Sequence, residues 1–581
     1  MVRRPGRRLA VQSFTMVIER TVGFGIFFAV IFFLHLVSRL NIHWDEFFFL
    51  SHVHCFTRGE VLSALQTFHV HLFAWLTHLP LNEIGQIIVG RYCIAAVGMA
   101  SGLMIYRISR LYLSRPGALF SALCYFSYAS TFFYGAQFRA DPLCLFLFLM
   151  ALEIVLRRPA LFLQAFAAGA LLALAWMISI KSSFYVVTIV LIYGIRFLTG
   201  ADKKHAAKEV FWFLVLWAGF VLLLSGWHRV LVAGPAACPA GSPGISIFFS
   251  LKSTFEKMFL DSPFFPRSKY FLLTVLRNPV TWCAMLFGIG LVLRDKSKIP
   301  AGTQDRRPLL ALIFLPLTVL FYRNAWPYYD VFILPPLMIF SGMTMEDALS
   351  RYGKTLSRLS GTAAFVLAAL VIATAGIHYE MHRSDGQKAQ KEMVTLVHAV
   401  FPEPVFYIDR CSMIASYPKA GFFMSTWGME EYRKTGVAVL ARAVEDKHPV
   451  FLIANKMALD SELSLGMKKK ARLLPEDEDT LRNNYIHHWG ALWVAGKTVE
   501  FSAAGKKEFS IDIPGVYTLE ANGPVMIDGE MFAPGSFVLL SAGTHVIKVD
   551  QAPVSISLRI GKNLYRPSVK PLTGPLFQGF Y

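Results

Sequence analysis

Hydrophobic residues occur along this chain in long runs that are separated by short polar or basic loops. An α-helix needs about 17 to 25 mainly apolar residues to cross a bilayer, and many of the runs approach this length. The pattern predicts a polytopic helical membrane protein with about eleven spans, several of them short. The predicted spans are 21–38, 84–106, 117–134, 143–155, 161–178, 184–197, 210–232, 271–293, 309–322, 331–345 and 363–377.

The pattern changes near residue 380 to short strands and polar turns. Apolar runs at 404–409 and 449–454 flank a helical stretch at 429–445, which predicts a small α/β unit with parallel strands. From about 497 to 560, apolar and polar residues alternate and glycine-containing turns recur, as expected of a β-sandwich or jelly roll. We therefore expect three domains, a membrane domain at 1–380, an α/β domain at 384–480 and a β-sandwich domain at 485–581.

Composition and charge agree with a membrane protein. Of the 581 residues, 55% are hydrophobic and 16% are charged, whereas about a quarter are charged in a soluble chain. Lysine and arginine gather at the N-terminus and in every second loop, at 107–115, 157–158, 196–208, 294–307 and 351–358. Because such loops face the cytoplasm, we expect a cytoplasmic N-terminus, a first span retained as an anchor and an extracytoplasmic C-terminal part. The net charge of +19 then reflects topology and needs no nucleic-acid partner. We expect the membrane to be a bacterial inner membrane.

An acidic pair, Asp45-Glu46, follows the first predicted span within the segment His43-Trp44-Asp45-Glu46. Carboxylates at the edge of a membrane are costly, and such a pair is therefore a candidate functional site. The alternative is a solvated loop or a helix N-terminus, where acidic residues are also favoured.

Isolated cations lie on the same predicted face as the acidic pair. They are Arg139, Lys181 and Arg323, each beside the end of an apolar run. Arginine and lysine are the residues that bind phosphate, although a cation at a span end also extends to the interface for its own solvation. A carboxylate base beside a phosphate-binding cluster fits transfer of a group from a lipid phosphate to an acceptor.

These segments resemble the motifs of polyprenyl-phosphate-sugar glycosyltransferases with the GT-C fold, which include protein O-mannosyltransferases and the aminoarabinose lipid A transferase. The resemblance covers roughly residues 20–380. His43-Trp44-Asp45-Glu46 is similar to the Asp-Glu motif that follows the first span, with Trp44 in place of the proline of lipid-anchor mannosyltransferases. Arg139-Ala140-Asp141 is similar to the Arg-x-Asp stretch of the bacterial branch, and Lys181 and Tyr328-Tyr329 occupy places where such proteins carry a lysine and a tyrosine.

The resemblance implies an inverting transfer of a sugar from a polyprenyl phosphate to a hydroxyl of a cell-envelope glycan, a lipid or a protein. It implies that Asp45 is the base, that Glu46 orients the acceptor or is a second carboxylate, and that Arg139, Lys181 and Arg323 hold the departing phosphate. The residues expected to contact substrate are His43, Trp44, Asp141, Tyr328 and Tyr329.

Two alternatives remain open from the sequence. A flippase or transporter of lipid-linked sugars with a carbohydrate-binding outer domain would place ionisable residues at mid-span in repeated halves, whereas these charges lie at span ends. The pairs His52/His54 and His69/His71 either hold a divalent cation or face lipid headgroups from an interfacial helix, so no cofactor and no metal ligand is assigned. The β-rich domain either binds carbohydrate or serves only as a packing module.

Overall fold

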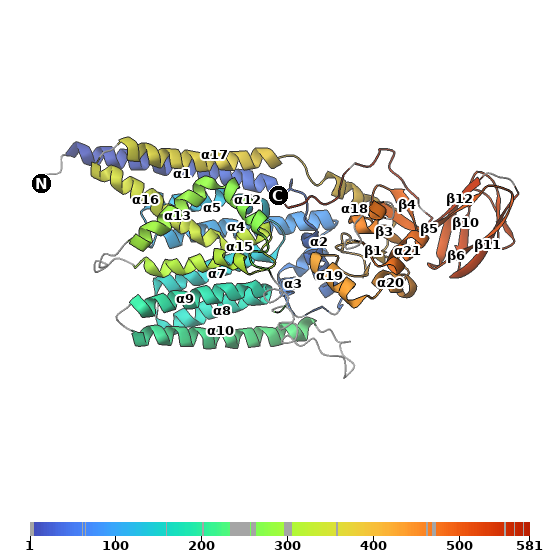
Figure 1. Ribbon diagram of the computed structural model, residues 1–581, viewed down its shortest axis with the longest axis horizontal. Helices are drawn as coiled ribbons and strands as arrows, with labels where there is room; N and C mark the ends of the chain where they lie inside the picture. The colour runs from blue at the N-terminus through green and yellow to red at the C-terminus, as the bar shows by residue number, and fades with distance from the viewer. Residues whose placement is uncertain are drawn as a thin grey trace.

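A bundle of long helices and a C-terminal region of strands and short helices lie end to end in the molecule (Figure 1). The computed structural model describes residues 5–60, 62–63, 65–158, 160–199, 203–232, 256, 263–294, 305–355, 358–460, 463–466, 472–550, 554–562, 564–572 and 574–580. The helix α1 begins at the end of the bundle that is farthest from the C-terminal region. Which end faces the cytoplasm stays a prediction from the charge pattern.

The bundle is made of long α-helices joined by shorter helical segments. Neighbouring helices pack in pairs, with α10 on α8, α13 on α16 and α1 against both α5 and α17. The segments are α1 (Pro5–Val37), α4 (Glu83–Ser109), α5 (Arg115–Ser127), α6 (Ala129–Tyr134), α7 (Ala140–Arg157), α8 (Leu161–Ile178), η2 (Ile180–Ser182), α9 (Ser183–Thr199), α10 (Lys203–Val232), α12 (Ser268–Arg277), α13 (Pro279–Arg294), η4 (Arg307–Ile313), α14 (Phe314–Leu317), η5 (Thr318–Leu320), η6 (Pro327–Tyr329), α15 (Asp330–Ile333), η7 (Pro335–Leu337), α16 (Met338–Thr355) and α17 (Arg358–His382).

The number of helices that can cross a membrane is lower than the eleven expected. Among the described residues, six helices are long and apolar enough, or eight if the bent pairs α12–α13 and η6–α16 each count as one span. The run at 117–134 is divided between α5 and α6, where Tyr128 leaves the helical conformation. The run at 309–322 forms short 3₁₀ and α turns, and α7 carries Asp141, Glu153 and Arg157 on 18 residues. Apolar content alone therefore overcounts continuous spans.

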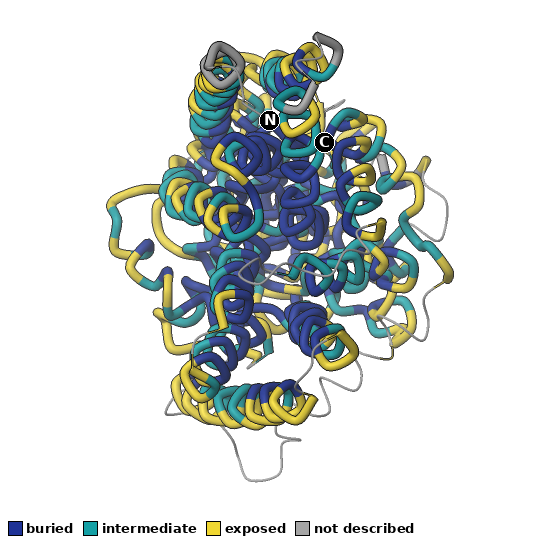
Figure 2. Tube along the Cα trace, turned by 90° about the vertical axis from the view of Figure 1, so that its left-hand side faces the viewer, coloured by how far each residue is buried: buried dark blue, intermediate teal, exposed yellow. Residues whose placement is uncertain are grey.

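Apolar side chains cover the outer surface of the bundle. Figure 2 views the bundle from its far end and shows buried positions at the centre and exposed ones on the peripheral helices. Only 11% of the apolar window of α10 is buried, and 28% of those of α1 and α17. A soluble surface does not expose this much apolar area, whereas a bilayer solvates it. The protein is therefore a multi-pass membrane protein.

The first part of the C-terminal region is the predicted α/β unit. β1 pairs in parallel with β3, as the two apolar runs predicted, and also in parallel with β2, which was not predicted. The predicted helical stretch is divided into α19 and α20, because Gly436 ends α19 in the left-handed conformation at φ 64°. The elements are α18 (Lys388–Val400), β1 (Tyr407–Ile408), β2 (Lys419–Ala420), α19 (Thr426–Thr435), α20 (Val439–Lys447), β3 (Phe451–Ile453), η8 (Met457–Leu459), η9 (Leu463–Gly466) and α21 (Pro475–Asn484).

The second part is rich in antiparallel strands, and its long strand β5 also belongs to the α/β unit. Among the described residues, an eight-stranded sheet has the order β10-β7-β12-β5-β3-β1-β2 with β4 also on β5, and a four-stranded sheet has the order β6-β11-β8-β9. The predicted turn Asp528-Gly529 joins β8 to β9, with both residues at positive φ. The strands are β4 (Tyr485–Trp489), β5 (Leu492–Phe501), β6 (Gly505–Ile511), β7 (Gly515–Glu520), β8 (Val525–Ile527), β9 (Glu530–Phe532), β10 (Phe537–Leu540), β11 (Gly543–Val549) and β12 (Val554–Ile560).

Three short helices connect the bundle to the C-terminal region: α2 (Trp44–Thr57), α3 (Val70–Phe73) and η1 (Ala74–His78). One face of α2 is buried, because Phe47, Leu50 and Val53 share a hydrophobic core with Val394 and Val397 of α18. This packing fixes α2 between the two parts of the molecule and turns its remaining face toward the end of the bundle.

Candidate active site

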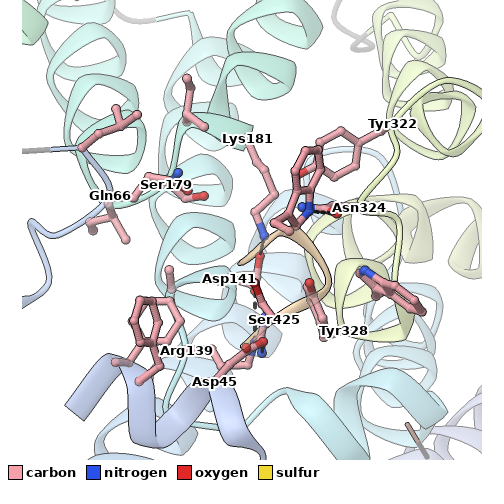
Figure 3. Close-up of a pocket in the computed structure, with 18 of the residues that line it drawn as sticks. Asp45, Gln66, Arg139, Asp141, Ser179, Lys181, Tyr322, Asn324, Tyr328 and Ser425 are labelled. Atoms are coloured by element: carbon pink, nitrogen blue, oxygen red, sulfur yellow. Dashed lines mark hydrogen bonds and ion pairs between the residues drawn. The ribbon is translucent and has the colours of Figure 1, made fainter. Parts of the chain in front are cut away.

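A cavity of about 1110 Å³ lies where the bundle meets the C-terminal region. Its lining comes from α2, the start of α7, the junction of α8 and α9, the loop between η5 and η6, and the loops around β1 and α19. Figure 3 shows that polar side chains from several of these segments point into it, including Asp45, Asp141, Lys181 and Tyr328.

A chain of ion pairs runs along the polar wall of the cavity. Arg139 donates to Asp45, with 2.5 Å between Nη1 and Oδ2, and its Nε lies 3.5 Å from Oδ2 of Asp141. Lys181 donates to the other oxygen of Asp141. The structure thus brings four predicted site residues together, from three segments that are distant in the sequence (Figure 3). Two carboxylates and two cations alternate, so each charge is compensated in the absence of substrate.

Asp45 is held in place by the capping structure of α2. Its neighbour His43 is the N-cap residue, whose Nδ1 accepts from the backbone N–H of Asp45, while Glu46 accepts from the backbone N–H of His43. This capping box satisfies N–H groups that a helix start leaves unpaired. The side chain of Asp45 is left to face the cavity, with 18% of its surface exposed.

The electrostatic surroundings keep Asp45 ionised and His43 neutral. Burial raises the pKa of Asp45, but the opposing charge of Arg139 and the hydrogen bond that Arg139 donates outweigh it, so the pKa lies below its usual value. Burial lowers the pKa of His43 to about 4, and the neighbouring Arg139 adds to that effect. At neutral pH, Asp45 is therefore a carboxylate that can accept a proton, and His43 is an uncharged hydrogen-bonding group.

Glu46 lies behind the cavity wall instead of in it. Its side chain is fully buried, and both of its oxygens bind the guanidinium of Arg91 at 2.7 Å. Arg91 also donates to the carbonyl oxygens of Val37, Leu40 and Asn41. This buried pair therefore ties α4 to the end of α1 and to the start of α2. Glu46 does not line the cavity.

Aromatic rings surround the cations of the site. The guanidinium carbon of Arg139 lies 3.7 Å from the centre of the Tyr328 ring, and Nζ of Lys181 lies 5.6 Å from it. Tyr328 lines the cavity, whereas Tyr329 is fully buried beside it and its hydroxyl binds Thr318. Cation–π contact holds the planar face of Arg139 without using its N–H donors.

Arg323 is not among the residues that line the cavity. Its guanidinium forms an ion pair with Glu430 of α19 at 2.9 Å and lies 4.8 Å from the ring of Trp427. Its neighbours Tyr322 and Asn324 do line the cavity. The direction of a side chain on a non-helical loop is set by its partners, and the partner of Arg323 comes from the C-terminal region.

A cation from the C-terminal region enters the cavity instead. Arg410 follows β1 and places its guanidinium carbon 3.7 Å from the ring of Trp44. Its Nε is buried and has no hydrogen-bond partner among the residues that the structure describes. Among the described lining residues, Arg139, Lys181 and Arg410 face the two carboxylates Asp45 and Asp141, so the cavity carries one excess positive charge. The sequence offered no signal for Arg410, because nothing local distinguishes it from other arginines.

The candidate metal ligands do not form a cluster. No group of three or more His, Cys, Asp or Glu side chains suited to a metal ion occurs within the part of the chain that the structure describes. His54 binds Gln86 and His71 binds His228, and the carboxylates of Asp45 and Asp141 are bound to cations. The side chains in the described part of the chain are therefore not arranged to hold a divalent cation.

Comparison with known proteins gives a fold but no sequence family. No family model and no curated protein matches this chain. The apo oligosaccharyltransferase of Archaeoglobus fulgidus is similar with a TM-score of 0.55 at 10% identity, over 92% of this chain and 95% of that chain. ArnT from Cupriavidus metallidurans bound to undecaprenyl phosphate is similar with a TM-score of 0.51 at 14% identity, over 78% and 93%. Archaeal AglB in complex with an inhibitory peptide and a dolichol-phosphate has a TM-score of 0.50 at 11% identity, over 89% and 74%. These are GT-C glycosyltransferases, and this chain has the GT-C fold with a C-terminal region that contains sheets.

Proposed function

We propose that this protein is a membrane glycosyltransferase that moves a sugar from a polyprenyl phosphate to a hydroxyl acceptor, with inversion at the anomeric carbon. The observation that carries the proposal is the chain of ion pairs from Asp45 through Arg139 and Asp141 to Lys181 along one cavity wall. It combines an ionised base with cations that suit a phosphate, in a fold whose structural neighbours include ArnT bound to undecaprenyl phosphate.

The composition of the cavity supports a donor with a lipid tail. Beside the ionic wall, the cavity is lined by the apolar side chains of Ile178, Phe184, Val187, Phe314 and Phe321. These belong to α8, α9, α14 and the end of η5, which are parts of the membrane bundle. An isoprenoid chain could lie against this apolar side while its phosphate reaches Lys181 and Arg139.

The proposed reaction needs one base and a stabilised leaving group. An acceptor oxygen attacks the anomeric carbon of the donor, its proton passes to the carboxylate of Asp45, and the bond from the anomeric carbon to the phosphate oxygen breaks. The electron pair of that bond stays on the phosphate, whose added charge Arg139, Lys181 and Arg410 stabilise. When the phosphate binds Arg139, it competes with Asp45 for the guanidinium. The weakened ion pair lets the carboxylate of Asp45 face the acceptor.

The proposal places the other cavity residues around the substrates. Trp44, Asp141 and Tyr328 line the cavity and would contact the sugar or the phosphate. His43, Glu46 and Tyr329 lie behind them and would hold the wall in shape. The acceptor, whether a cell-envelope glycan, a lipid or a protein, reaches the cavity from the side of the C-terminal region.

The function is tested with purified protein and labelled polyprenyl-phosphate sugars. We expect release of the sugar to an acceptor, and we expect Asp45→Asn to lower the transfer rate by roughly 100-fold or more while undecaprenyl phosphate still binds, because the amide keeps the shape but accepts no proton. Asp347→Asn is the matched control, since Asp347 pairs with Arg351 on α16 and does not line the cavity. Wild-type turnover by Asp45→Asn would remove Asp45 from the role of base.

A further inference from the structure

The chain returns to the active site after its last strand. Residues 574–580, here called the return segment, follow β12 in sequence but lie against the bundle. Figure 1 marks the C-terminal end of the chain beside α12 and α2, far from the strands β6 to β12. A segment that follows the most distant sheet is thus packed against the start of α2, which carries Asp45.

The return segment is fixed to the chain just before Asp45. Asn41 donates from Nδ2 to the carbonyl oxygen of Leu576 at 3.1 Å, and its Oδ1 accepts from the backbone N–H of Gln578 at 3.2 Å. Phe577 is buried, with its ring 5.9 Å from that of Phe47 and 6.1 Å from that of Trp44. The backbone of the return segment is therefore hydrogen-bonded to Asn41, and its side chains pack against Trp44 and Phe47.

Phe580 then reaches the cavity wall and contacts two separate elements. On one side its ring lies 5.4 Å from His43 and 5.7 Å from Trp44, the two residues before Asp45 at the start of α2. On the other side it stacks on Trp326 at 4.9 Å and lies 6.0 Å from Tyr328, at the start of η6. Phe580 also lines the cavity itself.

We propose that Phe580 is a positioning residue of the active site, which holds the start of α2, with Asp45, and the helix η6, with Tyr328, at a fixed separation. Asp45 and Tyr328 both contact Arg139, Asp45 through an ion pair and Tyr328 through the face of its ring. A shift of either helix changes the direction of the guanidinium and of the base together. Small displacements of reacting groups cost large factors in rate, on the order of 100-fold for 1 Å. The expected effect on the rate rests on the proposed function, whereas the fixed separation of the two segments is independent of it.

The test compares Phe580→Ala, Phe580→Tyr and the control Leu572→Ala in the full-length protein in detergent. Leu572 precedes the return segment, and its side chain is 44% exposed. Backbone hydrogen exchange at residues 43–46 is measured first. We expect it to rise at least about tenfold in Phe580→Ala and to stay at the wild-type value in Phe580→Tyr and Leu572→Ala. Unchanged exchange in a folded Phe580→Ala protein overturns the proposal. If that variant does not fold, Phe580→Leu, which keeps apolar volume without a ring, decides by the same criterion.

The kinetic part separates positioning from general stabilisation. We expect Phe580→Ala to lower kcat for sugar transfer about tenfold, to change the affinity for undecaprenyl phosphate less than twofold, and Phe580→Tyr to restore kcat. Equal losses of kcat, lipid affinity and melting temperature in Phe580→Ala would show a merely structural role and overturn the proposal. If wild-type protein transfers no sugar, the proposed function fails, and the exchange measurement still decides whether Phe580 fixes the start of α2.

Discussion

At the scale of single residues, Asp45 has the environment of a base that stays ionised. The pKa of a buried carboxyl group normally rises, but Arg139 reverses this for Asp45. The basicity of Asp45 therefore depends on Arg139. When the guanidinium of Arg139 pairs with the substrate phosphate instead, the basicity of Asp45 rises at the step in which it must take up a proton.

This dependence predicts a shift in the pH profile of Arg139→Gln. Without the guanidinium, the largest influence that opposes burial is lost, so the pKa of Asp45 rises and its carboxylate becomes protonated at a higher pH than in the wild type. The acidic limb of kcat against pH should move to higher pH, on top of a lower maximum from weaker phosphate stabilisation. Pre-steady-state or steady-state rates between pH 4 and pH 9, at about saturating donor, measure this. A limb that stays in place would show that another group titrates.

Glu46 belongs to the same scale but has a structural role. Removing one partner of a buried ion pair leaves the other charge uncompensated, at a cost of roughly 3 kcal/mol or more. We expect Glu46→Gln to lower the free energy of unfolding by about that amount, because Arg91 remains buried. Denaturant unfolding in detergent gives the value, with Glu445→Gln, an exposed residue of α20, as the control. Equal stability of the two variants would contradict this view of Glu46.

The sequence predicted those site residues whose place follows from the direction of the helices. Asp45, Arg139 and Lys181 each stand beside the same end of an apolar helix, so alternation of the spans brings them to one face. Arg323 stands at a similar position, but its side chain is directed by Glu430, a partner that no local pattern reveals. Arg410 reaches the cavity through the packing of β1 against the rest of the sheet, which is a long-range outcome.

At the scale of elements, turns were easier to predict than spans. The pair Asp528-Gly529 joins two short strands because both residues adopt positive φ, and only a few residue types do so without strain. The expected spans outnumber the six to eight long apolar helices among the described residues, because a hydropathy pattern does not show where a helix breaks, as at Tyr128.

The turn gives a matched test at this scale. Gly529 has φ of 92° and open space around its Cα, so Gly529→Ala introduces backbone strain without a clash. We expect a loss of stability of about 1 kcal/mol for this variant and of much less for Gly523→Ala, which also meets open space but lacks a positive φ. Thermal unfolding of both variants provides the comparison, and sugar transfer should be unchanged in both. An equal loss of stability in the two variants would show that alanine adopts the positive φ at position 529 without strain.

At the scale of the whole molecule, the active site is shared between the bundle and the C-terminal region. Arg410 supplies the excess positive charge of the cavity and forms no ion pair with any of the described residues. We expect Arg410→Gln to weaken binding of undecaprenyl phosphate about tenfold, whereas Arg442→Gln, at an exposed position of α20, should leave it unchanged. Titration of each purified variant with the lipid measures this. Equal affinity in both variants would show that Arg410 does not bind the phosphate and that its guanidinium only packs on Trp44.

The strand β5 determines how far the parts of this protein are modular. Its first residues pair with β3 and its later residues with β12, so one strand is common to the α/β unit and to the β-rich part. A cut at residue 497 would pass through this strand and also remove Phe580 from the cavity. The two parts of the C-terminal region should therefore unfold in a single transition. Recombination between related genes could therefore exchange the α/β unit and the β-rich part only together.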